Sequence, residues 1–166
     1  MSESDQNRQT ETRVVLIPTD GSQHSDRALK WYLDNLKRDN DCIRFLCVIE
    51  PVYTTPAFSV MVDAPPVSDL KHFMEERIAE GKKECNRCIE IVRKIGAQAQ
   101  GIIRIDNNAG HAILKTATEH NANIIVMGSR GHGLLRRTFL GSVSQYILHH
   151  AHIPVAIIPQ ESKDHQ

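Results

Sequence analysis

The sequence predicts an α/β fold: a doubly wound parallel sheet of five strands with four helices. Two observations support this prediction, namely the two kinds of segment in the chain and their alternation. Short apolar runs rich in β-branched residues alternate with longer segments whose apolar residues recur at helical spacing. Strands that alternate with helices pair in parallel and carry helices on both faces of the sheet. Right-handed crossovers then leave few arrangements, and the strand order expected for such folds in general is 3-2-1-4-5.

The elements follow one another in strict alternation along the chain. Strands are expected at 13–20, 42–50, 99–106, 123–128 and 153–159. Helices are expected at 21–39, 69–95, 109–121 and 142–151, the first behind an N-cap at Ser22 or Ser25. Segment 51–68 contains four prolines and has no clear period, so it is interpreted as a long loop or flap whose role stays open.

Composition and charge predict one globular domain, which we place at 13–159 between flexible tails at 1–12 and 160–166. The chain has 166 residues, of which 40% are hydrophobic and 24% charged. Twenty Lys and Arg balance twenty Asp and Glu, so net charge gives no argument for a nucleic-acid partner or an acidic membrane surface. The polar start has no signal-peptide pattern, and no apolar run approaches the ~18 residues of a membrane span. We therefore expect a cytoplasmic protein.

The second helix carries the most regular apolar stripe. Its members are spaced alternately by four and three residues: Met74, Ile78, Gly81, Cys85, Cys88, Val92 and Ile95. Cys85 and Cys88 also spell C-x-x-C, a pattern found in redox and zinc sites. A zinc site needs two further ligands, and no second C-x-x-C supplies them. Both thiols are expected to be buried and to pack as small hydrophobic side chains.

Segment 128–142, GSRGHGLLRRTFLGS, concentrates glycine and arginine between a strand and a helix. Glycines let backbone N–H groups converge on an oxygen anion, and Gly141 and Ser142 open the last helix, whose positive dipole end faces the same loop. Arg130, Arg136 and Arg137 add positive charge. These features together predict a phosphate site.

Two well-known phosphate loops do not fit this segment. A Walker A loop needs G-x-x-x-x-G-K-[ST], and the only Gly-Lys pair in the chain, Gly81-Lys82, lies within a predicted helix. The dinucleotide fingerprint G-x-G-x-x-G belongs after the first strand, whereas Gly131-His132-Gly133 follows the fourth and Arg136 takes the place of the last glycine.

Gly128, Gly131 and Gly141-Ser142 have the spacing G-x2-G-x9-G-[ST], which resembles the nucleotide-binding motif of the universal stress protein family. VVLIPTDGSQHSDRAL near the start is similar to the first strand and turn of that family, and IPVAIIP to its closing strand. The resemblance covers about residues 13–159. It implies a Rossmann-like fold, also called adenine nucleotide α-hydrolase-like, together with dimers and binding of ATP, AMP or ADP, and it leaves Mg²⁺ open as a companion ion.

The resemblance also implies which residues contact the nucleotide. Pro18 and Thr19 would line the pocket, and Asp20 would hold the ribose, a suitable task because a carboxylate accepts hydrogen bonds from hydroxyls but repels phosphate. Val48 would meet adenine through its backbone, and Met127 and Gly128 would approach the nucleoside. The phosphates would lie against Arg130, Gly131, Gly133, Gly141, Ser142, Val143 and Ser144. One local departure is HNANIIVMG, where a more acidic ADLIVMG is expected; it changes no pocket residue.

Three functions stay open at this point: a nucleotide-dependent switch or sensor, a slow ATP hydrolase on the same site, and an interaction module without nucleotide. No G-x-S-x-G, H-E-x-x-H or paired acids accompany the phosphate site, which favours binding over catalysis and assigns no catalytic residue. The intact glycine spacing argues against the third function. An apolar closing strand at 153–159 would expose unpaired backbone at a sheet edge, which predicts a homodimer through that strand.

The histidines favour structural interpretations. His149, His150 and His152 lie around the end of the last helix, where imidazoles interact well with the helix dipole and where chain directions diverge too much for a metal site. We therefore assign no metal ligand. His24 and His132 flank the predicted pocket, and His132 is within reach of phosphate by position only.

Overall fold

In the computed structural model, the described residues are 12–51, 67–129 and 140–160. Strands and helices alternate along the chain as the sequence predicts. The elements are β1 (Arg13–Pro18), α2 (Gln23–Asn35), β2 (Asp41–Ile49), α4 (Val67–Arg93), β3 (Gln98–Ile105), α5 (Ala109–Glu119), β4 (Ile124–Gly128), α6 (Ser142–His150) and β5 (Val155–Ile158). The first and last strands are shorter than expected, because Thr19 and Asp20 turn into α2 and Pro154 precedes the final pairing.

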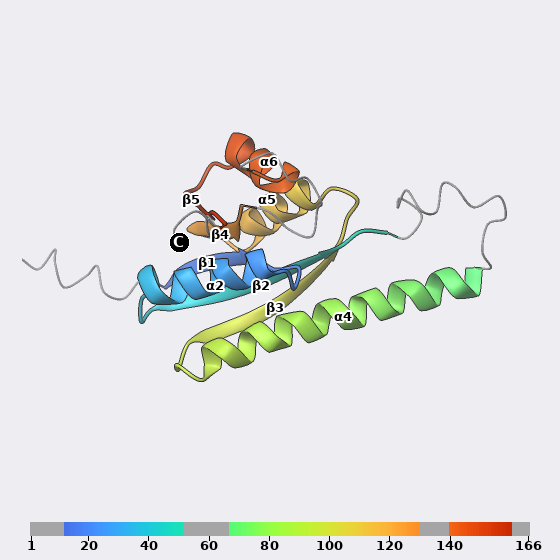
Figure 1. Ribbon diagram of the computed structural model, residues 1–166, viewed down its shortest axis with the longest axis horizontal. Coiled ribbons are helices and arrows are strands. Elements are labelled where there is room, and N and C mark those ends of the chain that lie inside the picture. The colour runs from blue at the N-terminus through green and yellow to red at the C-terminus, as the bar shows by residue number, and fades with distance from the viewer. Residues whose placement is uncertain (1–11, 52–66, 130–139, 161–166) are drawn as a thin grey trace, which may run out of the picture.

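The five strands form one parallel sheet in the order β3-β2-β1-β4-β5, which confirms the predicted doubly wound fold (Figure 1). From β1 the chain moves outward to β2 and β3, and it then returns to place β4 on the other side of β1. The order therefore reverses between β1 and β4, which pair at Val15↔Ile124 and Leu16↔Ile125. The carboxyl ends of two strands at such a reversal flank a crevice in which doubly wound folds bind ligands.

Two hydrophobic layers cover the sheet. On one face, strand residues such as Ile17 and Phe45 pack with Tyr32 of α2 and Val92 of α4. On the other face, a second cluster joins the strands to α5 and α6; its buried members are Leu16, Leu46, Ile113, Ala117, Ala122, Ile125, Met127 and Ile147. Side chains alternate between the faces of a strand, so neighbouring residues such as Leu16 and Ile17 enter different layers. The strands are apolar on both faces, as a covered parallel sheet requires.

The apolar stripe of α4 is confirmed over most of its length. Gly81, Cys85, Cys88 and Val92 are buried against β2 and β3, as their helical spacing predicts. Ile95, by contrast, is 52% exposed, because α4 ends at Arg93 and the chain then turns through Gly96, which has a φ of +74°. The inclusion of Ile95 in the stripe was therefore wrong.

All four cysteines are free thiols. Cys85 and Cys88 are each 2% exposed within the core, which confirms that they pack as buried side chains. Burial raises the pKa of Cys85 and raises that of Cys88 to about 12, so both are neutral thiols at ordinary pH. Among the described residues, no helix is long and apolar enough to span a membrane.

Candidate functional site

The loop after β1 contains hydrogen bonds between its own side chains and backbone. Ser22 caps α2 by accepting a hydrogen bond from the Ser25 N–H at 3.2 Å, which settles the cap between the two serines considered. The Asp20 carboxylate accepts from the Ser22 N–H at 3.0 Å. Gly21 has a φ of +75°, a conformation that glycine adopts at little cost. Asp20 is therefore presented, exposed, at the carboxyl end of β1.

The second loop joins the carboxyl end of β4 to the start of α6. The Gly141 N–H donates to the Ser129 carbonyl at 2.6 Å, and the Ser144 hydroxyl donates to the same carbonyl at 2.8 Å. Helix α6 begins at Ser142 behind Gly141, which has no side chain to cap the helix. The positive end of the α6 dipole therefore lies beside the end of β4, in an arrangement suited to an anion.

Main-chain directions at this edge follow from the hydrogen bonds of the sheet. The Thr19 N–H donates to the Leu46 carbonyl at 2.8 Å, so Leu46 directs its peptide groups toward β1. Residues two apart in a strand direct these groups to the same side, so Val48 directs its own toward the space past the end of β1. On β4, the amides of Ile125 and Ser129 donate to β5, which leaves Gly128 directed toward β1. The backbone N–H and C=O groups of Val48 and Gly128 thus face the same crevice.

Gly128 has a packing requirement of its own. A Cβ at this position would lie 2.7 Å from the His24 carbonyl oxygen, closer than a real contact allows. Met127 beside it is 6% exposed and packs into the layer under α5 and α6. The glycine therefore lets β4 approach the first turn of α2.

Two predicted contact residues direct their side chains into the protein. The Thr19 hydroxyl donates to Glu84 of α4 at 2.7 Å, and Thr19 is only 6% exposed. The Ser144 hydroxyl is bound to Ser129 and is buried. Pro18 closes β1, while Ser142 is exposed and Val143 half-buried at the start of α6. Arg130, Gly131 and Gly133 lie outside the described residues, as do the nearby His132, Arg136 and Arg137.

Sequence reasoning missed the charged residues of α4 that support the first loop. Glu84 accepts hydrogen bonds from Arg87 at 2.7 and 2.8 Å as well as from Thr19, and Arg87 also pairs with Asp26 of α2. The Arg87 guanidinium and the Thr19 hydroxyl lower the pKa of Glu84 to about 2. A Glu-x-x-Arg pair on one helix face is a common surface pattern, so its spacing gave no sign that the carboxylate reaches β1.

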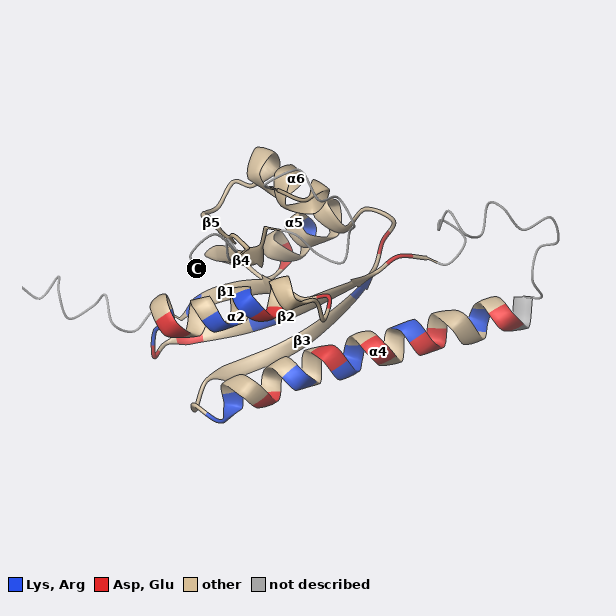
Figure 2. Ribbon diagram, in the orientation of Figure 1, with Lys and Arg blue, Asp and Glu red and all other residues tan. Residues whose placement is uncertain are grey.

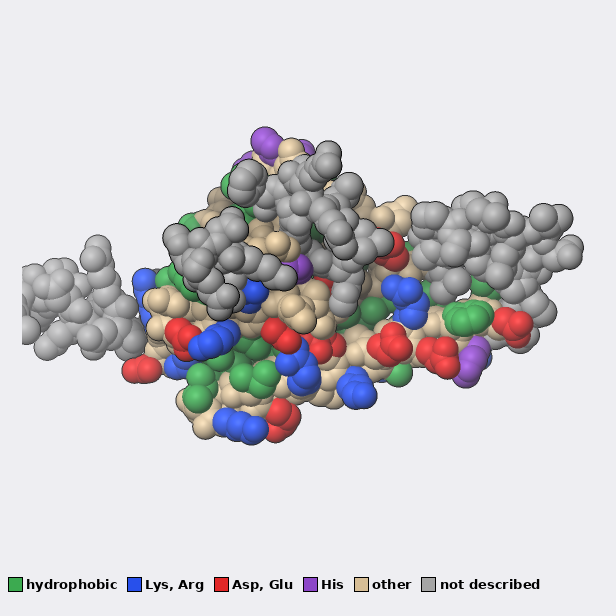
Figure 3. Space-filling model, in the orientation of Figure 1, with side chains coloured by type: hydrophobic (Ala, Val, Ile, Leu, Met, Phe, Trp, Pro, Cys, Tyr) green, Lys and Arg blue, Asp and Glu red, His purple; other side chains and the backbone are tan. Residues whose placement is uncertain are grey.

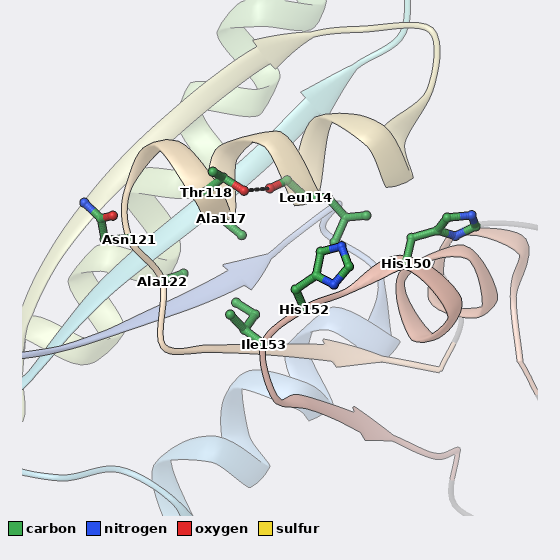
Figure 4. A pocket seen from close by; sticks show the side chains of 8 residues that line it. All are labelled: Leu114, Ala117, Thr118, Asn121, Ala122, His150, His152 and Ile153. Atoms are coloured by element: carbon green, nitrogen blue, oxygen red, sulfur yellow. Dashed lines mark hydrogen bonds between the residues drawn. The ribbon is translucent and has the colours of Figure 1, made fainter.

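The histidines at the end of α6 lie near the amino end of β5, at the opposite end of the strands from the proposed crevice. His150 and His152 border a cavity of about 270 Å³ between α5 and the segment before β5, with Ala117 and Ile153 among its apolar lining (Figure 4). The His150 ring stacks on Tyr146 at 4.2 Å between centroids, and its Nδ1 lies 2.8 Å from the Tyr146 carbonyl. These contacts give His150 a structural role. The described residues contain no group of three or more side chains placed to hold a metal ion.

The face formed by α2 and α4 carries both signs of charge. Lys and Arg alternate with Asp and Glu along α4, and Lys71 pairs with Glu75 one turn away (Figure 2). The space-filling view shows these charges mixed, with hydrophobic side chains between them (Figure 3). A surface of this kind lacks the single-sign field that attracts a polyanion.

Comparison with known proteins agrees with this architecture. The model of the universal stress protein family matches residues 11–159. The chain belongs to the universal stress protein family. It is 32% identical over 149 residues to the universal stress protein YxiE of Bacillus subtilis, across 87% of this chain and 97% of YxiE.

Another relative in the family is longer. The universal stress protein Rv1996 of Mycobacterium tuberculosis is 28% identical over 161 residues, which are 90% of this chain and 49% of Rv1996. The chain thus spans about half the length of this relative.

Solved structures of other universal stress proteins share the fold. UspA from Lactobacillus plantarum superposes with a TM-score of 0.73 at 22% identity, over 90% of this chain and 99% of that one. A family member from Arabidopsis thaliana with AMP bound gives 0.64 at 18% identity, over 92% and 94% of the two chains. A universal stress protein from Archaeoglobus fulgidus in complex with dAMP superposes with a TM-score of 0.59 at 20% identity, over 89% of this chain and 98% of that one.

Proposed function

We propose that this chain binds an adenine nucleotide, ATP in the first place, in the crevice between the carboxyl ends of β1 and β4. The observation that carries the proposal is that two loops follow the carboxyl ends of β1 and β4, the adjacent strands between which strand order reverses. One loop presents Asp20, and the other brings the start of α6 to the end of β4 through the Gly141–Ser129 hydrogen bond. The AMP and dAMP bound in two proteins of the same fold support the choice of ligand.

The geometry suggests a task for each group. The uncapped start of α6, at Ser142 and Val143, suits the phosphates, and Arg130, Gly131 and Gly133 would complete their site. Asp20 would accept hydrogen bonds from the ribose hydroxyls, and the backbone of Val48 would face the adenine. Thr19 and Ser144 would act indirectly by fixing the two loops, since their hydroxyls are bound within the protein. Mg²⁺ bound with ATP would be held mainly by phosphate oxygens and water.

In this proposal the nucleotide is a signal rather than a substrate. Occupancy of the crevice would change the contacts that the protein makes with a second copy, through β5, or with partners in a stress response. The same site would support slow ATP hydrolysis, and phosphate release well above background and abolished by Gly131→Ala would identify an enzyme.

A charge placed at the start of α6 tests the proposal. Ser142→Glu adds a carboxylate where the phosphates are expected, yet a negative charge at a helix start stabilises the helix by about 0.5 kcal/mol, so the fold should be kept. We expect calorimetry to show at least about tenfold weaker ATP binding, as for close like charges across an interface. Thr118→Glu, which adds the same charge at the far end of α5, is the matched control and should bind ATP as the wild type does.

The nucleotide carried from the cell provides a second, independent measurement. Denaturing the purified protein should release an adenine nucleotide identifiable by its mass. If nothing is released and titration with ATP, ADP and AMP at millimolar concentration shows no binding, the proposal is wrong and the interaction module without nucleotide becomes the better description.

A further inference from the structure

Glu84 is an unusual residue among the charged side chains of α4 because it faces the sheet. Its side chain is 15% exposed, whereas that of Glu90 on the same helix is 59% exposed. Glu84 accepts the Thr19 hydroxyl hydrogen bond at 2.7 Å, across 65 residues of sequence. The Cys88 thiol also lies within hydrogen-bond distance of this carboxylate, at 3.4 Å.

The charge on Glu84 is compensated by Arg87, which shares the carboxylate oxygen Oε1 with Thr19. Arg87 donates to both carboxylate oxygens and pairs with Asp26 of α2, so one guanidinium links α4 to α2. This pairing keeps the pKa of Glu84 at about 2, and the carboxylate stays ionised throughout the ordinary pH range. An ionised acceptor makes a stronger hydrogen bond to Thr19 than a neutral one would.

Thr19 is therefore fixed at two points, one on the main chain and one on the side chain. Its N–H is bound to Leu46 of β2 and its hydroxyl to Glu84 of α4. Gly21 lies near the same carboxylate without touching it through a side chain, since a Cβ added there would be 3.6 Å from Glu84 Oε2. Asp20 directly follows Thr19, and its own carboxylate accepts a hydrogen bond from the Ser22 N–H.

We propose that Glu84 is a positioning residue for the nucleotide site: through Thr19 it sets the place of the neighbouring Asp20 carboxylate and thereby the recognition of the ribose. The inference rests on the proposed nucleotide binding and deepens it. It assigns α4, on which none of the residues proposed to contact the nucleotide lies, control over one end of the site. The phosphate end is independent of Glu84, because the Gly141–Ser129 and Ser144–Ser129 bonds that form it involve other elements.

The test compares ATP with 2′,3′-dideoxy-ATP, which keeps adenine and phosphates but lacks the hydroxyls that Asp20 would bind. Wild-type full-length protein should prefer ATP by at least about tenfold in calorimetry, the order of one hydrogen bond to a charged group. In Thr19→Val and Glu84→Ala this preference should fall below about threefold, while affinity for the dideoxy ligand changes little. A general loss of stability would weaken the binding of both ligands together and leave the ratio of the two affinities unchanged.

Two controls accompany the comparison. Thr19→Ser keeps the hydroxyl and should restore the preference that Thr19→Val loses. Glu90→Gln removes a carboxylate that also pairs with the arginine three residues on, but from the exposed side of α4, and should keep the wild-type preference. If Glu84→Ala does not fold, Thr19→Val decides, because it removes one hydroxyl and keeps the side-chain shape.

The possible failures are distinguishable. A wild-type preference retained in folded Thr19→Val and Glu84→Ala would overturn the role of Glu84 and leave nucleotide binding intact. A wild-type protein that binds both ligands equally would show that Asp20 does not recognise the ribose, which also overturns the inference. A wild-type protein that binds neither ligand would refute the proposed function itself.

Discussion

Asp41 shows at the scale of a single residue how a buried charge fixes the start of the sheet. Its side chain is fully buried at the first position of β2, where it accepts two hydrogen bonds from the Arg13 guanidinium, at 2.6 and 2.7 Å. The Tyr32 hydroxyl and the Arg38 N–H donate to the same carboxylate, at 2.6 and 2.8 Å. One carboxylate thereby ties β1, α2 and β2 together.

Asp41 and Glu84 predict how stability depends on pH. Burial alone would raise the pKa of Asp41, but the bonds from Arg13, Tyr32 and Arg38 outweigh it and lower the pKa; that of Glu84 is lowered to about 2. A carboxylate with a depressed folded pKa stabilises the fold above its unfolded pKa, near 4, and loses this contribution as pH falls through the folded value. The free energy of unfolding should therefore be nearly constant from pH 7 to 5 and should fall between about pH 4 and 2.

Asp41→Asn tests this assignment. At pH 7 it should lower the free energy of unfolding by about 3 kcal/mol, because it leaves the Arg13 charge without its partner. It should also flatten the decline between about pH 4 and 2, since one titrating carboxylate is gone. Urea unfolding across that pH range measures both effects. Asp34→Asn, which breaks an exposed pair with Lys30, should change neither, and an equal effect of the two variants would contradict the assignment.

At the scale of elements, the contact between β4 and α2 is set by a missing side chain. The His24 carbonyl belongs to the first turn of α2, so a Cβ on Gly128 would meet backbone that cannot rotate away. This close approach matters for the site because Gly128 ends β4 at the proposed crevice. A packing role and a ligand role for Gly128 are compatible.

Gly128→Ala should force β4 and α2 apart. We expect a loss of about 1–3 kcal/mol in the free energy of unfolding, the usual result of overpacking a rigid contact, together with weaker nucleotide binding. Gly81→Ala is the matched control: its new methyl would lie 3.0 Å from Ile49 Cδ1 and 3.1 Å from Cys47 Sγ, which are ends of side chains, and α4 gains about 1 kcal/mol of helix propensity. Chemical unfolding of both variants should separate them, and a Gly128→Ala protein as stable as the wild type would disprove the close contact.

Local patterns predicted the elements and failed where distant elements decide. The 3.6-residue stripe of α4 placed Cys85 and Cys88 in the core, and cap chemistry placed the start of α2 at Ser22 or Ser25, of which Ser22 is the cap. The apolar spacing predicted that the buried stripe continues to Ile95, but α4 ends at Arg93 and the chain turns at Gly96, so Ile95 is exposed. The inward turn of Thr19 depends on Glu84, 65 residues away, and no local pattern encodes such a contact.

At the scale of the whole molecule, the strand order places β5 at one edge of the sheet. Its inner side pairs with β4, as the Ile125 N–H donates to the Pro154 carbonyl and the Ser129 N–H to the Ile158 carbonyl. Since peptide groups alternate in direction along a strand, Ala156 faces β4 and the two residues beside it, Val155 and Ile157, face the outer edge. A second copy would pair with the outward groups of Val155 and Ile157.

The proposed homodimer through β5 can be tested by proline at this edge. Proline at Ile157 removes an outward N–H and is tolerated on edge strands, so Ile157→Pro should give a folded monomer in analytical ultracentrifugation. Ala156→Pro makes a poor test on its own, because it removes an N–H directed to β4 and should lower the melting temperature more. If the wild type is a dimer and folded Ile157→Pro is still one, the interface lies on another surface. A dimer lost only in Ala156→Pro would reflect damage to β5 itself, because the outer edge is unaltered in that variant.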